Sequence, residues 1–79
     1  MLIGTVINTL PTKRCNPHLA GQTVLLVKSQ EELIPALDQV NAGVGDRVLV
    51  ITGPAAEKYC MTSPADAAVI AILDTAATE

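Results

Sequence analysis

The sequence contains no Phe and no Trp, and Tyr59 is its only aromatic residue. Proteins that bind single-stranded nucleic acid stack the bases on aromatic side chains in a basic groove. This chain has neither feature, because its net charge is −3 and Lys13-Arg14 is its only adjacent basic pair. The composition therefore argues against nucleic acid as a partner.

Long hydrophobic runs are also missing. The longest uninterrupted apolar run, Ala67 to Leu73, is far shorter than the roughly 20 residues of a membrane helix. Met1 leads directly into strand-like residues, without the basic start and cleavage site of a secretory signal. We therefore expect no membrane partner and a cytoplasmic protein with reduced thiols.

The chain has two cysteines, far apart in sequence, and one histidine. Cys15, His18 and Cys60 supply three zinc ligands but no fourth, which is a weak metal pattern. Cys15 beside Lys13-Arg14, with His18 as a base, would suit a thiol enzyme, but no third group orients the pair. We rank that hypothesis last and predict no metal, no cofactor and no catalytic residue.

The apolar residues that are present are small. Hydrophobic residues make up 49% of the 79 residues, and they are mainly Val, Ile, Leu and Ala. A single domain over 1–79 buries only about 60% of its unfolded surface. Since such a core is thin, we expect the chain to bury further apolar surface between subunits.

The pattern predicts short strands separated by turns. Leu2 to Leu10, Thr23 to Lys28 and Arg47 to Ile51 are rich in β-branched residues, and Thr23 to Lys28 looks buried on both faces. Gly4 weakens its strand unless the chain bends there or another backbone passes close by. Pro11 to Gln22 is a long loop.

Three further segments complete the prediction. Ser29 and Glu32 fit a capping box, so Ser29 to Leu33 is predicted as a helical turn that ends at Pro35, and Ala36 to Val40 as a strand. All five prolines then lie between strands. Gly53-Pro54 opens a short helix. Ser63 to Asp74 fits a helix and a strand equally well, and the whole pattern favours a small β-barrel or sandwich.

The loop NAGVGD, Asn41 to Asp46, could cradle a phosphate. A phosphate loop precedes a helix, whereas a strand follows here. We therefore predict that Gly43 and Gly45 adopt positive φ in a tight connection and that Asp46 accepts turn hydrogen bonds. Asp38, Asp66 and Asp74 also lie at strand ends or turns, which favours capping roles over acid/base catalysis.

Three stretches, IGTVINTLPTKRCNPHLAGQTVLLV, LDQVNAGVGDRVLVITGPAAE and SPADAAVIAILD, resemble the EutN/CcmL family of bacterial microcompartment vertex proteins. The most specific pieces are Asp38 followed by Ala42 to Leu49, and the ending from Pro64 to Asp74. The resemblance implies a mainly β fold: a five-stranded OB-like β-barrel with one short α-helix, assembled as a cyclic homopentamer. It also implies that Ala68 to Leu73 is a strand.

What the resemblance implies for function is structural. The pentamer would cap the five-fold vertices of a shell in the cytoplasm and contact hexameric shell proteins. Asn41 stands where the family often has Gly, and Glu57 stands where it commonly has Arg, so no specific salt bridge is carried over. The alternative function is a small OB-type module that binds a ligand or nucleic acid. The turn and interface candidates are Asp38, Asn41, Gly43, Gly45, Asp46, Glu57, Asp66 and Asp74.

Overall fold

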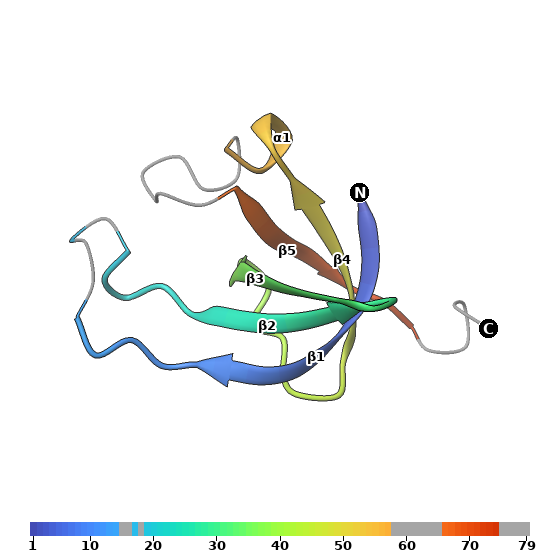
Figure 1. The fold of residues 1–79 in the computed structure, drawn as a ribbon, viewed down its shortest axis with the longest axis horizontal. Helices are drawn as coiled ribbons and strands as arrows, with labels where there is room; N and C mark the ends of the chain where they lie inside the picture. The colour runs from blue at the N-terminus through green and yellow to red at the C-terminus, as the bar shows by residue number, and fades with distance from the viewer. Residues whose placement is uncertain (15–16, 18, 58–65, 75–79) are drawn as a thin grey trace.

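The structure is a computed structural model that describes residues 1–14, 17, 19–57 and 66–74. Within these residues the chain forms five strands and one short helix (Figure 1). The elements are β1 (Leu2–Leu10), β2 (Val24–Ser29), β3 (Glu32–Asp38), β4 (Arg47–Thr52), α1 (Pro54–Glu57) and β5 (Ala67–Ile72).

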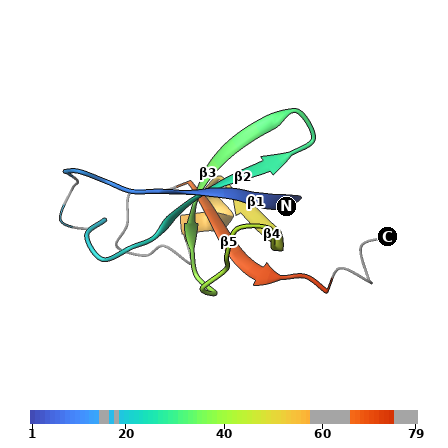
Figure 2. The ribbon, with the colours of Figure 1, turned by 90° about the horizontal axis from the view of Figure 1, so that it is seen from below.

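The strands close into a barrel in the order β1-β2-β3-β5-β4. Every neighbouring pair is antiparallel except β3 and β5, which run parallel and pair only at Leu37↔Ala68 and Asp38↔Val69. In Figure 2 the hairpin of β2 and β3 lies on one side of the barrel and β5 on the other. The prediction of a mainly β, five-stranded barrel with one short helix is confirmed.

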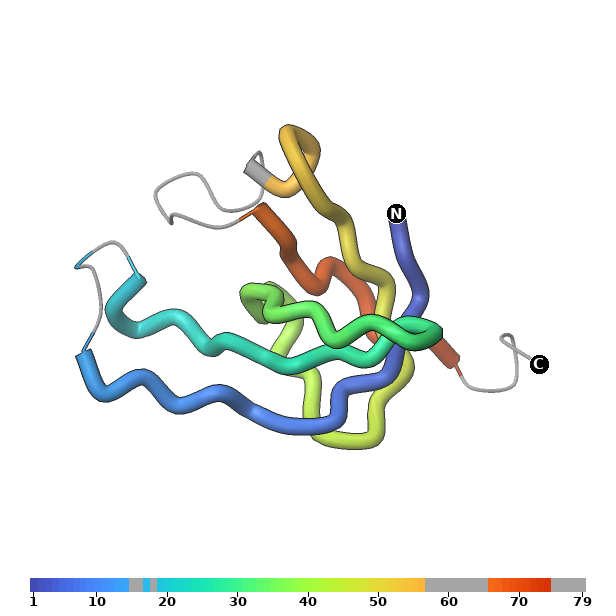
Figure 3. Tube along the Cα trace, in the orientation of Figure 1, coloured from blue at the N-terminus to red at the C-terminus, as the bar shows by residue number. Residues whose placement is uncertain are grey.

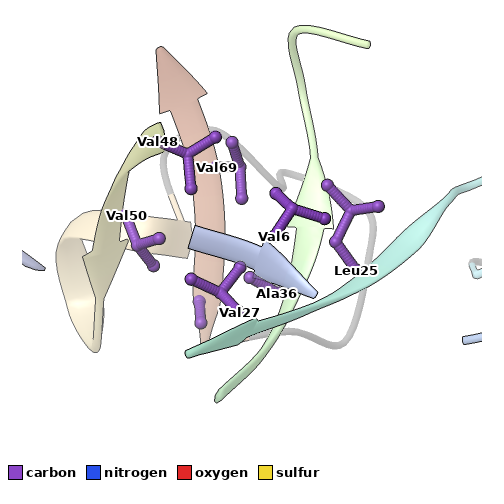
Figure 4. Close-up of a cluster of buried hydrophobic side chains, with 8 residues drawn as sticks. Val6, Leu25, Val27, Ala36, Val48, Val50 and Val69 are labelled. Atoms are coloured by element: carbon purple, nitrogen blue, oxygen red, sulfur yellow. The ribbon is translucent and has the colours of Figure 1, made fainter. Parts of the chain in front are cut away.

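The barrel interior is filled by aliphatic side chains (Figure 4). Strand alternation sends every second residue inward. Each buried Val or Leu contributes roughly 1.5–3 kcal/mol to the stability of the fold. The core formed by the described residues is small and contains no aromatic side chain. The buried residues of this cluster are Val6, Leu25, Val27, Ala36, Val48, Val50, Ala67 and Val69.

A second apolar cluster lies on the outside of the barrel, where Ala56 of α1 packs with Leu37, Ile51 and Ala68. Gly53 turns the chain out of β4 with φ 65°, and Pro54 begins α1. The predicted helix after Gly53-Pro54 is confirmed as far as Glu57, and its remaining residues lie outside the described part. The helix thus covers apolar groups that would otherwise face outward.

Gly4 lies next to the residues through which β1 pairs with β2, one residue before Thr5. A Cβ at Gly4 would lie 2.5 Å from Val27 Cγ1 and 2.8 Å from the Lys28 carbonyl oxygen. Of the two alternatives given for Gly4, the structure shows the close approach of another backbone. Glycine here allows two strands to approach at the curved side of the barrel.

The predicted helical turn from Ser29 to Leu33 is wrong. Ser29 ends β2, Gln30 and Glu31 form the turn, and Glu32 starts β3. Ser29 is buried, and its hydroxyl donates to the Ile3 carbonyl oxygen at 3.0 Å instead of capping a helix. The capping-box spacing coincides with a hairpin because six residue pairs between β2 and β3 outweigh the local preference.

Pro35 does not end a segment, and the statement that all five prolines lie between strands is wrong. It lies within β3 opposite Leu26, so the third strand runs from Glu32 to Asp38 and not from Ala36 to Val40. β3 pairs with β5 only at its end, which leaves the other edge of Glu32–Ala36 unpaired among the described residues. Proline is tolerated on such an edge because no ladder hydrogen bond is lost there.

The remaining strand predictions hold with small changes. β1 has the predicted bounds, β4 extends the predicted strand by Thr52, and the ambiguous end is β5, although Ser63 lies outside the described residues. The second strand is shifted by one residue, and only one of its faces is fully buried. Leu25 and Val27 are buried, whereas Leu26 is half-buried and Lys28 is exposed.

Candidate functional site

The connection between β3 and β4 starts from Asp38, the half-buried last residue of β3. Its Oδ1 accepts hydrogen bonds from the backbone N–H groups of Val40, at 3.0 Å, and Ala42, at 3.2 Å. An Asp side chain that binds nearby backbone amides in this way fixes a turn. Asp38 therefore has the predicted role of turn acceptor.

Asn41 lies between these two amides and has φ 59°, in the left-handed region. Asn enters this region more readily than most residues because its short amide can hydrogen-bond locally. Gly45 has φ 95°, as predicted, but Gly43 is not among the positive-φ residues, so the prediction is wrong for Gly43. The left-handed residue that the turn requires before Gly45 is Asn41.

Asp46 closes the connection. Its Oδ2 accepts from the Gly43 N–H at 2.8 Å, and its own N–H donates to the Gly43 carbonyl at 3.1 Å. The connection is also fixed to β1, since Gly45 N–H donates to the Val6 carbonyl at 2.8 Å and Val6 N–H donates to the Asp46 carbonyl at 3.0 Å. The amides of Gly43 and Gly45 thus bond within the protein, which is inconsistent with a phosphate cradle.

The other candidate carboxylates lie elsewhere. Asp66 precedes β5, and its carbonyl accepts from Gly53 N–H at 2.7 Å while its side chain is exposed. Glu57 is the last residue of α1, and Asp74 is exposed two residues after β5. The structure therefore brings Asp38 and Asp46 into one connection and leaves the other three apart from it in the chain.

Within residues 1–14, 17, 19–57 and 66–74, no three His, Cys, Asp or Glu residues are grouped so that they could hold a metal ion. Cys15, His18 and Cys60 lie outside the described residues. Over the same ranges, no helix has the length and apolar character required to cross a bilayer.

The outside of the barrel carries two apolar surfaces that sequence reasoning did not identify. The first, here called the β4 face, lies across β1, β4 and β5. Val48 and Val50 point inward, so Leu49 points outward, and the register aligns it with Ile3 and Ala71. The β4 face consists of Ile3, Leu49, Ile70 and Ala71, and all four are half-buried or exposed.

The second surface, here called the hairpin face, lies across β2 and β3. Leu25, Val27 and Ala36 point inward, so their neighbours point outward. Leu26 and Pro35 are opposite each other, and so are Lys28 and Leu33. The hairpin face consists of Val24, Leu26, Leu33 and Pro35. Apolar residues at successive outward positions, which are every second residue of a strand, are the signal that identifies both faces.

The fold of this barrel is similar to that of solved proteins. The family model described as ethanolamine utilisation protein EutN/carboxysome matches residues 1–74. The chain belongs to the EutN/CcmL family. Members of this family are structural shell proteins and not enzymes.

Three relatives illustrate the similarity. The carboxysome shell vertex protein CcmL of Synechococcus elongatus is 40% identical over a match 81 residues long. The match covers 91% of this chain and 78% of that protein. The structure of CcmL from Nostoc sp. PCC 7120 has a TM-score of 0.87 and 33% identity, covering 95% of this chain and 90% of that one. The GrpN pentameric microcompartment shell protein from Rhodospirillum rubrum has a TM-score of 0.83 and 32% identity, covering 95% of both chains.

Proposed function

We propose that five copies of this EutN/CcmL chain form a ring that occupies the five-fold vertices of a bacterial microcompartment shell and closes it. The observation that carries the proposal is the match of nearly the whole barrel to a shell protein described as pentameric, with 95% of each chain covered. The function is geometric, since a five-subunit wedge supplies curvature that a flat hexagonal sheet lacks.

The physical chemistry of the single chain favours such an assembly. The core formed by the described residues contains no aromatic side chain, and a domain of this size is marginally stable alone. Outward-facing aliphatic side chains remain on both sides of the barrel, including Ile3 at 49% exposure and Leu33 at 56%. Contact between subunits would remove these groups from water and add the stabilisation that the core lacks.

The proposed partners are further copies of the chain and hexameric shell proteins, in a shell within the cytoplasm. Nucleic acid is not a proposed partner, because the net charge of −3 repels phosphate backbones and the chain has one aromatic residue. Fluorescence anisotropy with a labelled single-stranded oligonucleotide should give no salt-dependent shift. A shift that decreases with salt would instead favour the OB-type binding module.

Native mass spectrometry tests the ring directly. At micromolar concentration the spectrum should be dominated by five copies of the 8.2 kDa chain. A strict monomer under these conditions would contradict the proposal.

Deletion of the gene in its source bacterium tests the position in the shell. The deletion strain should contain elongated or unclosed shells, and a plasmid copy of the wild-type gene should restore closed polyhedra. Normally sealed polyhedra in the deletion strain would count against the vertex role.

A further inference from the structure

We propose that the β4 face of one subunit docks on the hairpin face of the next subunit around the ring. This inference rests on the proposed pentamer and names the two surfaces that form its repeated contact. A cyclic ring with an odd number of subunits needs a heterologous interface, in which two different surfaces of each copy meet.

The first observation is that each face is a continuous apolar surface and not a set of scattered residues. Ile3, Leu49 and Ala71 are consecutive partners across three adjacent strands. Leu26 and Pro35 are direct partners, and Leu33 lies two residues before Pro35 on the same side of β3. Single exposed apolar residues need no explanation, whereas contiguous apolar patches mark interaction sites.

The second observation is the placement of the two faces. The barrel order puts β1 between β4 and β2 on one side, and β5 between β4 and β3 on the other. The two faces therefore lie on different strands, although Val24 and Ile70 both pack against the cluster around Ala56, and Figure 2 shows the hairpin of β2 and β3 directed away from β5. One subunit can thus contact a neighbour on each side, as a ring requires.

The shapes and charges at the two faces also differ. A groove of about 210 Å³ beside the hairpin face, with Val24, Pro35 and Leu37 in its walls, offers room for a protruding side chain. Arg47 borders the β4 face, as the outward residue before Val48. Near the hairpin face, Glu31 lies in the turn and Glu32 is the first residue of β3, with Lys28 on β2.

Arg47 adds an independent indication. Its Nε is buried and has no hydrogen-bond acceptor among the described residues. A buried donor without an acceptor is destabilising, and more so when it belongs to a charged group. An acceptor from the next subunit would satisfy this donor at the border of the β4 face.

Two substitutions test the pairing. Ile3→Lys places a charge in the β4 face, and Leu33→Glu places one in the hairpin face. Both residues are about half-exposed in the single chain, so the barrel should tolerate either change. Each variant should raise the concentration at which the pentamer dissociates by at least about tenfold, because a buried unpaired charge is costly.

Val44→Glu is the matched control. Val44 is an apolar residue at 65% exposure in the β3–β4 connection, outside both faces. This variant should remain pentameric at the wild-type concentration. If Ile3→Lys or Leu33→Glu loses the circular dichroism spectrum of a β protein, Ile3→Thr and Leu33→Thr are tested in their place. Threonine puts a polar group on each face and is a residue that strands favour. They should shift dissociation in the same direction.

A mixture of the two charged variants decides whether the faces meet each other. The Leu33→Glu chain retains its β4 face and the Ile3→Lys chain retains its hairpin face, so the mixture should form heterodimers that neither variant forms alone. Absence of heterodimers at concentrations where the wild type is pentameric would overturn the pairing. Pentameric wild type with pentameric face variants would overturn the inference alone, whereas a monomeric wild type would contradict the proposed ring itself.

Discussion

Gly4 is the residue at which the barrel tolerates no side chain. A methyl group there would overlap Val27 Cγ1 and the Lys28 carbonyl, and the latter belongs to the backbone of β2. Gly4→Ala should therefore reduce the free energy of unfolding by about 1–3 kcal/mol, the range for overpacked sites.

The matched control for this change is Gly43→Ala. A Cβ at Gly43 would meet only Asp46 Oδ2, at 3.8 Å, and Gly43 does not need positive φ. Urea unfolding of the two variants should show a large loss for Gly4→Ala and a change within about 0.5 kcal/mol for Gly43→Ala. Equal losses would contradict the proposed overlap.

Asn41 tests the left-handed position in the β3–β4 connection. At φ 59° an alanine is disfavoured by about 1–2 kcal/mol, whereas glycine is at no steric disadvantage. Asn41→Ala should lower the urea midpoint by the equivalent of about 1 kcal/mol, and Asn41→Gly should leave it nearly unchanged or raise it. A stabilising Asn41→Ala would contradict the turn geometry.

At the level of elements, the β3–β4 connection depends on one carboxylate. Asp38→Ala removes the acceptor for the amides of Val40 and Ala42, which should destabilise the protein by about 1–3 kcal/mol. Asp38→Asn keeps an oxygen acceptor and should cost less. Hydrogen exchange at Val40 and Ala42 is the measurement, and unchanged protection of both amides in Asp38→Ala would exclude this role.

The elements also show what a sequence can and cannot specify. β1 and β4 are recognisable because they are rich in β-branched residues, and Asn41 is recognisable because its amide tolerates a left-handed backbone. Ser29 and Glu32 satisfy a local capping rule, which predicts a helical turn where the structure has a hairpin. β2 pairs with β3 over its whole length, and a rule that considers only neighbouring residues does not predict such pairing.

The candidate site also combines features that local sequence predicts with features that depend on which strands are neighbours. The turn roles of Asp38 and Asp46 follow from their side-chain chemistry and their positions after and before strands, so they were predicted. The two apolar faces depend on which strands are neighbours in the closed barrel, and Leu49 meets Ile3 only through that order. The interface roles assigned to Asn41, Gly43, Gly45, Glu57, Asp66 and Asp74 stay predictions.

At the scale of the whole molecule, the barrel carries a projecting arm. The described chain measures 39 × 25 × 22 Å, and residues 11–14 after β1 and 19–23 before β2 extend away from the barrel (Figure 3). This arm adds exposed surface without adding to the buried cluster within the barrel. A small core that supports an extended arm is a further reason for folding to depend on assembly.

Coupled folding and assembly makes a thermal prediction. Because a ring that forms only from folded chains stabilises the folded state by mass action, Tm of the wild type should rise with protein concentration. Differential scanning fluorimetry over an approximately hundredfold concentration range is the measurement. Tm of the Ile3→Lys variant should depend much less on concentration, and a concentration-independent wild type would indicate that the monomer is stable by itself.

Pro35 affects how a chain that is proposed to assemble with copies of itself can associate. The edge of β3 that carries it is unpaired over Glu32–Ala36 in the described chain, and its missing N–H interrupts the row of donors there. Open strand edges are templates on which other chains add as amyloid-like ladders. The proline thus disfavours unlimited strand addition at this edge, which is compatible with the proposed ring, whose side-chain contacts end when it closes.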